Sequence, residues 1–283
     1  MGEFNITVKG GCRPCAMRLQ LDPAYPPEKF IIEHLAAGSF CEPDIAEIFL
    51  RVLREGDTVV DVGANVGFFT VLAAALVGPG GRVVSFEPDP SNFARLQANV
   101  QANGFTHVTL INRPVSDHAG PVSFFLNSDD SGGSALWDPA QYPGNVLTQA
   151  NPRVLSLEST TLDAELERLA LPSVRLLKVD TEGAEHQVVR GARRLLANRG
   201  IPFVVAELHP FGLEKLGTNQ RALRDDMASA GYDTFLLYQK GTLPRFIPPA
   251  TTIQSQFFCN ILFTTAEGVG THWPTCLHDP RTA

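Results

Sequence analysis

One stretch, Thr58–Thr70, constrains the fold of this 283-residue chain more than any other. It reads T-V-V-D-V-G-A-N-V-G-F-F-T: a β-branched run ends at Asp61, a turn lies between Gly63 and Gly67, and an apolar segment of helical length follows. A buried parallel strand, a glycine turn and a helix N-terminus form a nucleotide-cofactor site, because backbone N–H groups and the helix dipole converge there. The stretch therefore predicts a cofactor site at the end of this strand.

Strands and helices alternate along most of the chain, which is typical of an α/β protein with a doubly wound, mostly parallel sheet. One helix is expected to include Val188–Leu196 on a single buried face. The runs Asp233–Tyr238 and Phe257–Thr264 have no helical segment between them, so we expect an antiparallel C-terminal edge hairpin. The other predicted strands are rich in apolar or β-branched residues and lie at Thr58–Val62, Arg82–Phe86, Val108–Ile111, Val122–Leu126, Val154–Leu157, Val174–Val179 and Pro202–Leu208.

We expect three parts: an N-terminal arm over residues 1–42, a main domain over 43–265 and a C-terminal tail over 266–283. The arm has no clear period, and its Pro-rich patch Asp22–Pro27 favours an extended connector. The sequence leaves open whether the arm is a short strand-and-loop lid or irregular. The segment Asn127–Asn151 is a long predicted loop, and loops of that length are usually functional or disordered.

Composition and charge narrow the class of protein. A hydrophobic content of 44% and a charged content of 19% are ordinary for a globular protein, and the net charge of −7 argues against a nucleic-acid partner. No apolar run is long enough for a signal peptide or a membrane span, and five cysteines suit a reducing cytoplasm, so we expect a cytoplasmic protein. Cys12 and Cys15 form a lone C-x-x-C without further zinc ligands, so ordinary thiols are expected.

Polar residues follow four of the predicted strands directly. Asp61, Glu87, Asp180 and the pair Glu207 and His209 lie at strand ends, where open α/β sheets bind their ligands. Glu87 comes roughly 20 positions beyond the glycine turn, where a carboxylate accepts hydrogen bonds from ribose hydroxyls. Dinucleotide enzymes and S-adenosylmethionine enzymes share this feature.

Three features favour S-adenosylmethionine. The turn from Gly63 to Gly67 lacks the three-glycine spacing that admits a pyrophosphate, and Asp61 adds negative charge that suits a cationic ligand. The chain also ends in a predicted hairpin rather than a second βαβαβ half. A purely structural role stays open for three of the polar residues. Asp61 can fix the glycine turn, Glu185 can interact with the dipole at the start of a helix, and His209 can cap a loop.

Four motifs follow one another along the chain: D-V-G-A-N-V-G at 61–67, F-E-P at 86–88, L-K-V-D-T-E-G-A-E at 177–185 and E-L-H at 207–209. Together they resemble the FkbM family of S-adenosylmethionine-dependent methyltransferases, over about Pro43 to Thr265. The segment Asn112–Asp117 is similar to the one that follows the family's third strand. The resemblance implies a Rossmann-like class I methyltransferase fold and methyl transfer, usually to an oxygen of a sugar or secondary metabolite.

The resemblance also implies a role for each matched residue. The turn glycines and Asn65 would face the methionine part of the donor, and Glu87 would face its ribose. Ser116 and Asp117 would lie at the adenine edge, with Asp180 near the sulfonium. The expected cofactor-binding residues are thus Asp61, Gly63, Asn65, Gly67, Glu87, Ser116, Asp117 and Asp180.

The sulfonium is an activated methyl donor, so the enzyme supplies in-line positioning and a proton acceptor. His209 is the first candidate for this base, because a neutral imidazole titrates in a suitable range; Asp180 and Glu182 are the alternatives. By the resemblance, Glu182 and His209 would face the acceptor. The acids between Asp180 and Glu207 also suit Mg²⁺, but the sequence cannot show that they converge, and no metal is expected.

We therefore expect an S-adenosylmethionine-dependent O-methyltransferase that acts on a hydroxyl or carboxyl of a sugar or small secondary metabolite and releases S-adenosylhomocysteine. A Rossmann-type NAD(P)-dependent oxidoreductase and a non-catalytic cofactor-binding scaffold are the alternatives. The N-terminal arm and the loop Asn127–Asn151 are expected to select the acceptor. The sequence gives no expectation for the oligomeric state.

Overall fold

The structure is a computed structural model that describes residues 1–9, 14–238, 242–255 and 258–273. Cys12, Phe257 and the part of the expected tail after residue 273 lie outside the described residues. Within these ranges, no helix combines the length and the apolar character that crossing a membrane requires.

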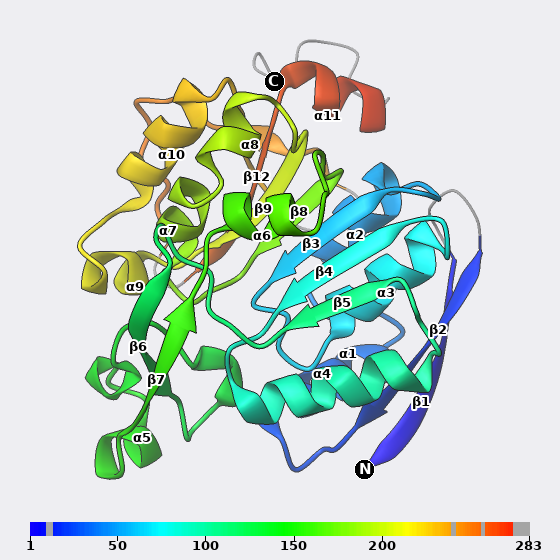
Figure 1. Cartoon of the computed structure of the whole chain (residues 1–283), viewed down its shortest axis with the longest axis vertical. Coiled ribbons are helices and arrows are strands. Elements are labelled where there is room, and N and C mark those ends of the chain that lie inside the picture. Colours follow the sequence, from blue (N-terminus) through cyan, green and yellow to red (C-terminus); the bar gives the residue numbers. More distant parts are fainter. Residues whose placement is uncertain (10–13, 239–241, 256–257, 274–283) are drawn as a thin grey trace.

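A large mixed sheet forms the centre of the molecule (Figure 1). In the described part of the chain its eight strands are, in spatial order, β11 (Arg245–Phe246), β10 (Asp233–Leu236), β12 (Cys259–Thr264), β9 (Phe203–Leu208), β8 (Leu176–Val179), β3 (Thr58–Val62), β4 (Arg82–Phe86) and β5 (Val108–Ile111). Neighbouring strands from β9 to β5 are parallel, whereas β12 is antiparallel to both β9 and β10. The chain order reverses between β3 and β8, so these two strand ends form the switch point at which ligands bind in such sheets.

The central strands are mostly apolar because both faces of the sheet are covered; Asp61 in β3 and Lys178 in β8 are buried exceptions. Side chains alternate along a strand, so Val59 belongs to the hydrophobic cluster on one face and Val60 to the cluster on the other. Helices α2 (Pro43–Val52), α3 (Phe68–Val77), α4 (Pro90–Ala102) and α11 (Ala266–His272) contribute to the first cluster. Helices α6 (Leu162–Arg168), α7 (Glu185–Arg190), α8 (Arg193–Ala197), α9 (Pro210–Lys215) and α10 (Gln220–Ser229) contribute to the second. The doubly wound, mostly parallel sheet is confirmed.

The expectation of one helix over Val188–Leu196 was wrong. The chain forms α7 and α8 instead, with Gly191 and Ala192 between them. Gly191 lies against Ser116, where a Cβ would be 2.2 Å from the Ser116 carbonyl oxygen. The helical spacing of the apolar residues could not predict this close tertiary contact.

The N-terminal arm is an ordered hairpin and a helix. Strands β1 (Gly2–Val8) and β2 (Cys15–Leu21) pair antiparallel, and β2 packs against α3 and α4. Alternate residues of β2, Met17, Leu19 and Leu21, are buried. Of the two arrangements that the sequence left open, the structure has the one with strands.

Helix α1 (Pro26–Ala36) begins inside the Pro-rich patch, which is therefore not an extended connector throughout. Arg95 of α4 ties this helix to the main domain. Its Nη1 lies 2.6 Å from the fully buried carboxylate of Glu28, and its guanidinium lies 3.4 Å from the ring centroid of Tyr25. The arm thus packs onto the domain, and the expected boundary near residue 42 stays a prediction.

The expected antiparallel pair at the C-terminal side of the sheet is confirmed as β10 and β12. Strand β12 lies between β9 and β10 rather than outside them, so Asn260 stands opposite Glu207. The described part of the expected tail forms α11, which is followed by Trp273. Trp273 and Val269 are buried in the same cluster as α2.

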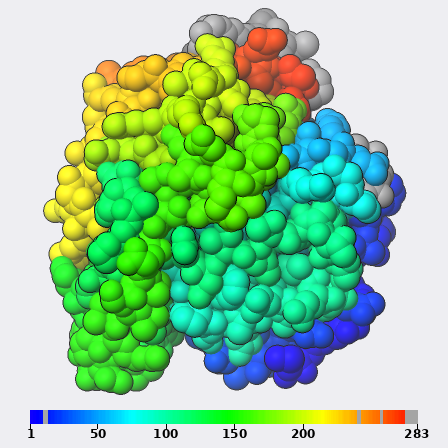
Figure 2. Space-filling view, in the orientation of Figure 1, coloured from blue at the N-terminus to red at the C-terminus, as the bar shows by residue number. Residues whose placement is uncertain are grey.

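Strands β6 (Gly120–Leu126) and β7 (Arg153–Ser159) pair with each other, apart from the main sheet. The segment between them holds the 3₁₀ turns Ser131–Gly133 and Pro139–Gln141 and the short helix α5 (Val146–Ala150). Figure 2 shows this segment in green, projecting at the lower left of the molecule. The long predicted loop therefore has local helical structure.

Candidate active site

A cavity of about 530 Å³ opens where β3, β4, β8 and β9 end. Its walls come from the turn after β3, the ends of β8 and β9, helix α1 and the segment between β6 and β7. A volume of this size is usual for a site that binds a small molecule or cofactor. We call it the strand-end cavity.

The glycine turn after β3 forms one wall. The backbone N–H groups of Gly63 and Ala64 both donate to the Phe86 carbonyl oxygen, at 3.0 and 2.9 Å, which fixes the turn to β4. Gly63 and Asn65 line the cavity, and the Asn65 side-chain oxygen is buried without a hydrogen-bond partner among the described residues. Gly67 instead packs against Leu96, so it shapes the turn from behind.

Glu87 closes the same wall from the end of β4. Its two carboxylate oxygens accept the backbone N–H groups of Asn65 at 2.7 Å and of Asp89 at 2.8 Å. The side chain is buried yet lines the cavity. Burial raises the pKa of Glu87 to about 8, although the two backbone hydrogen bonds favour the ionised form.

Asp61 lies behind the turn and is not among the cavity-lining residues. It is fully buried; one carboxylate oxygen accepts the Thr70 hydroxyl at 2.7 Å, and the other lies 3.8 Å from Lys178 Nζ. Burial raises the pKa of Asp61 more than the Lys178 ammonium lowers it. Among the described residues, no backbone N–H of the glycine turn donates to Asp61, so both its structural role in the turn and its role toward the donor stay predictions.

Lys178 is a site residue that the sequence reasoning missed. It is 3% exposed, lines the cavity, and lies 3.0 Å from Asp180 Oδ2. Burial lowers the pKa of Lys178, but the carboxylates of Asp180 and Asp61 more than reverse this, so the ammonium stays charged. A charged residue inside an otherwise apolar strand is the signal that could have found it, because a buried cation requires anionic partners.

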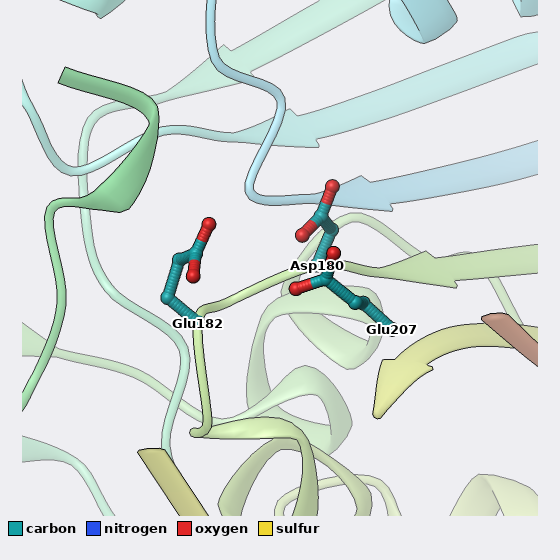
Figure 3. A group of neighbouring side chains, drawn as sticks. All are labelled: Asp180, Glu182 and Glu207. Carbon is teal, nitrogen blue, oxygen red and sulfur yellow. The ribbon is translucent and has the colours of Figure 1, made fainter. Parts of the chain in front are cut away.

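The carboxylates of Asp180, Glu182 and Glu207 converge in the cavity (Figure 3). One oxygen of each lies within 4.8 Å of the other two, although β8 and β9 supply them from positions far apart in the chain. Burial and the neighbouring acids raise the pKa values of Glu182 and Glu207 well above the usual range. A proton on either side chain is therefore held more firmly than on an exposed glutamate.

Glu185 serves another purpose. One of its oxygens accepts the N–H groups of Thr181 and Gly183 and the Thr181 hydroxyl, at distances between 2.9 and 3.1 Å. It fixes the turn that carries Glu182, whose φ of 55° lies in the left-handed region. Glu185 thus shapes the site from outside the cavity.

His209 lies at the N-terminus of α9, and its two ring nitrogens have different partners. Nδ1 accepts the Gly212 backbone N–H at 2.9 Å, so the proton of a neutral imidazole lies on Nε2. Nε2 lies 3.5 Å from a carboxylate oxygen of Glu182. The Trp137 indole N–H, in turn, donates to the Glu182 backbone carbonyl, and burial lowers the pKa of His209.

This arrangement bears on the choice of base. A neutral His209 has its accepting nitrogen occupied by Gly212, so it would have to release that hydrogen bond before it could take a proton. Among the described residues, no backbone N–H donates to the Glu182 carboxylate, so no such bond has to be released there. The geometry therefore favours Glu182 as the proton acceptor and His209 as the residue that orients it.

A family model described as the Methyltransferase FkbM domain matches residues 61–234, more than half of the chain. The chain belongs to the FkbM methyltransferase family. The predicted resemblance is confirmed, and with it the Rossmann-like class I methyltransferase fold. All the site residues expected from the sequence lie inside the FkbM domain.

Relatives of known name share part of this domain. The hexuronic acid methyltransferase AglP of Haloferax volcanii is 27% identical over 172 residues, which cover 59% of this chain and 62% of AglP. The 31-O-demethyl-FK506 methyltransferase FkbM of Streptomyces tacrolimicus is 31% identical over 177 residues, 56% of this chain and 67% of that enzyme. The match to AglP thus spans less than two thirds of that relative's length.

Among solved structures, methyltransferase FkbM from Methylobacillus flagellatus KT is 16% identical to this chain with a TM-score of 0.45. The match covers 75% of this chain and 45% of that one.

The residues expected at the adenine edge lie away from the cavity wall. Ser116 is buried, and the Asp117 carboxylate lies 2.9 Å from His118 Nδ1 and 3.5 Å from Arg190. The preceding residues 113–115 of the FkbM domain line the cavity instead. The adenine-edge role of Ser116 and Asp117 stays a prediction, and the segment after β5 does border the site.

Proposed function

We propose that this chain is an S-adenosylmethionine-dependent O-methyltransferase whose acceptor is a hydroxyl or carboxyl oxygen of a sugar or small secondary metabolite. The observation that carries the proposal is the position of the strand-end cavity at the strand ends of the FkbM domain. The cavity joins a glycine turn and Glu87 on one side to three carboxylates on the other.

The first wall suits the donor. The backbone of Gly63 and the unpartnered side-chain oxygen of Asn65 offer polar contacts to the methionine part, and Glu87 has acceptor capacity left for ribose hydroxyls. The acidic surroundings of Asp180 favour a cationic sulfonium. The donor supplies the activated methyl group, and the protein's part is alignment and removal of the acceptor proton.

The second wall suits an oxygen acceptor. Names of the relatives point to a hexuronic acid in one case and to a 31-O-demethyl compound in another. In this chain the acceptor would meet Glu182 and His209, with Trp137 beside them. Helix α1 and the segment between β6 and β7 also line the cavity, so we propose that they select the acceptor.

The direct test is to titrate the full chain with S-adenosylmethionine, S-adenosylhomocysteine and NADH by calorimetry. We expect saturable binding of the donor S-adenosylmethionine and of its product S-adenosylhomocysteine, and none of NADH. Incubation with methyl-labelled donor and a panel of sugars, uronic acids and hydroxylated metabolites should then give labelled product. Binding of NADH alone would support the oxidoreductase, and donor binding without transfer to any acceptor would support the scaffold.

The role of His209 can be separated from that of Glu182. In His209→Asn the side-chain oxygen can still cap α9 at Gly212, but the contact with Glu182 is lost. We expect stability and donor affinity near those of the wild type, and kcat reduced about tenfold because the base is less well oriented. Glu182→Gln should reduce kcat further, by about 10²–10⁴. A loss in His209→Asn equal to that in Glu182→Gln would instead make His209 the base.

A further inference from the structure

The side chains of Asp180, Glu182 and Glu207 bring three carboxyl groups together in a partly closed space. Their nearest oxygens lie within 4.8 Å of one another, and a hard cation needs several oxygen ligands at such separations. Among the described residues, Lys178 lies 3.0 Å from Asp180 and His209 lies 3.5 Å from Glu182. Lys178 is shared with Asp61, so its charge does not balance the group.

Glu207 adds a second observation. Its side chain is 7% exposed, and its buried Oε2 atom has no hydrogen-bond partner among the described residues. Native proteins rarely leave a buried polar atom unpaired unless a ligand, ion or water occupies the space beside it. Asn260, opposite Glu207 across the pair of β9 and β12, also lines the cavity with a buried, unpartnered oxygen.

We infer that Asp180, Glu182 and Glu207 bind a divalent cation that prefers oxygen ligands, such as Mg²⁺ or Mn²⁺, at the acceptor end of the strand-end cavity. From the sequence alone no metal is expected, although these acids suit Mg²⁺, because a sequence cannot show that the side chains converge. A cation at this point has room for further ligands from the acceptor, and a uronic acid or a vicinal diol offers two adjacent oxygens. This assignment of the acceptor class rests on the proposed function; the cation site does not.

The test measures Mn²⁺ binding to the full chain, without donor or acceptor, by electron paramagnetic resonance and calorimetry. We expect one saturable site. Glu207→Gln and Glu182→Gln should each weaken Mn²⁺ binding at least about tenfold, because ligand charge sets the affinity of such sites. Glu214→Gln removes the same charge from an exposed position on the adjacent helix α9 and should leave the affinity unchanged.

Circular dichroism and thermal melts establish that each variant is folded, and if Glu207→Gln does not fold, the more exposed Glu182→Gln carries the comparison. Absence of saturable binding at millimolar Mn²⁺ would overturn the cation site, as would equal affinity in the wild type and in the folded ligand variants. Donor binding is measured on the same samples. A chain that binds S-adenosylmethionine but not Mn²⁺ refutes the cation site alone, whereas Mn²⁺ binding without donor binding supports the cation site and refutes the proposed function.

Discussion

Gly63→Ala is expected to abolish donor binding and to lower the free energy of unfolding by about 3–5 kcal/mol. Gly63 has φ of +81°, and a Cβ there would lie 1.7 Å from the Asp180 carbonyl oxygen. Asp180 cannot easily move aside, because its own N–H donates to Val62 at 2.9 Å in continuation of the pairing between β3 and β8. Calorimetry with S-adenosylmethionine measures the loss of donor binding, and urea unfolding measures the loss of stability.

Gly56→Ala is the matched control. Its φ is +87°, close to that of Gly63, but no atom lies within 4 Å of the position that a Cβ would take. Only the backbone penalty of about 1–2 kcal/mol remains, and donor affinity should not change. The difference between the two variants is therefore the cost of forcing the ends of β3 and β8 apart. Gly63→Ala that is as stable as Gly56→Ala and still binds the donor would contradict this account.

Glu87→Gln is expected to weaken S-adenosylmethionine binding by about 10–100-fold at a pH above 8. The ionised carboxylate accepts the N–H groups of Asn65 and Asp89 and has lone pairs left for ribose hydroxyls, whereas the amide loses one accepting oxygen. Asp117→Asn is the comparison, since Asp117 lies outside the cavity wall. A loss in Asp117→Asn as large as that in Glu87→Gln would place Asp117 at the adenine edge after all.

The pH dependence of the same affinity tests the ionisation of Glu87. Burial raises the pKa of Glu87 to about 8, so without the donor the carboxyl is neutral below that pH. Donor hydroxyls favour the ionised form, so binding releases a proton and the affinity rises with pH, by up to about tenfold per pH unit, until pH 8. Above pH 8 this contribution is constant. Calorimetry across this range should show the rise in the wild type and a flatter profile in Glu87→Gln; equal slopes would assign the titration to another group.

Local patterns predicted much of the fold. The run Thr58–Val62, the glycine turn and the alternation with helices depend on neighbours in sequence, and all are observed. The break between α7 and α8 coincides instead with the contact between Gly191 and Ser116, which lie 75 positions apart in the sequence. The sequence alone does not predict the hairpin of β1 and β2, because the alternation of buried residues at Met17, Leu19 and Leu21 is short.

The same distinction applies to the site. Strand-end position predicted that Glu87 and Asp180 would reach one cavity, and both line it. The direction in which a strand-end side chain points was not predictable. Asp61 directly precedes the glycine turn, yet its carboxylate lies in the interior beside Thr70 and Lys178. The sequence also could not assign the two nitrogens of His209, because the Gly212 N–H reaches Nδ1 only once α9 has formed.

The position of β12 has a consequence for the order in which the site is assembled. The FkbM domain match ends at residue 234, whereas the strand that pairs with β9 spans Cys259–Thr264. Until those residues have left the ribosome, β9 has an unpaired edge whose backbone groups are open to association with other chains. Asn260 is also missing from the cavity beside Glu207 until then. The acceptor end of the cavity is thus completed only after the donor side already has all of its residues.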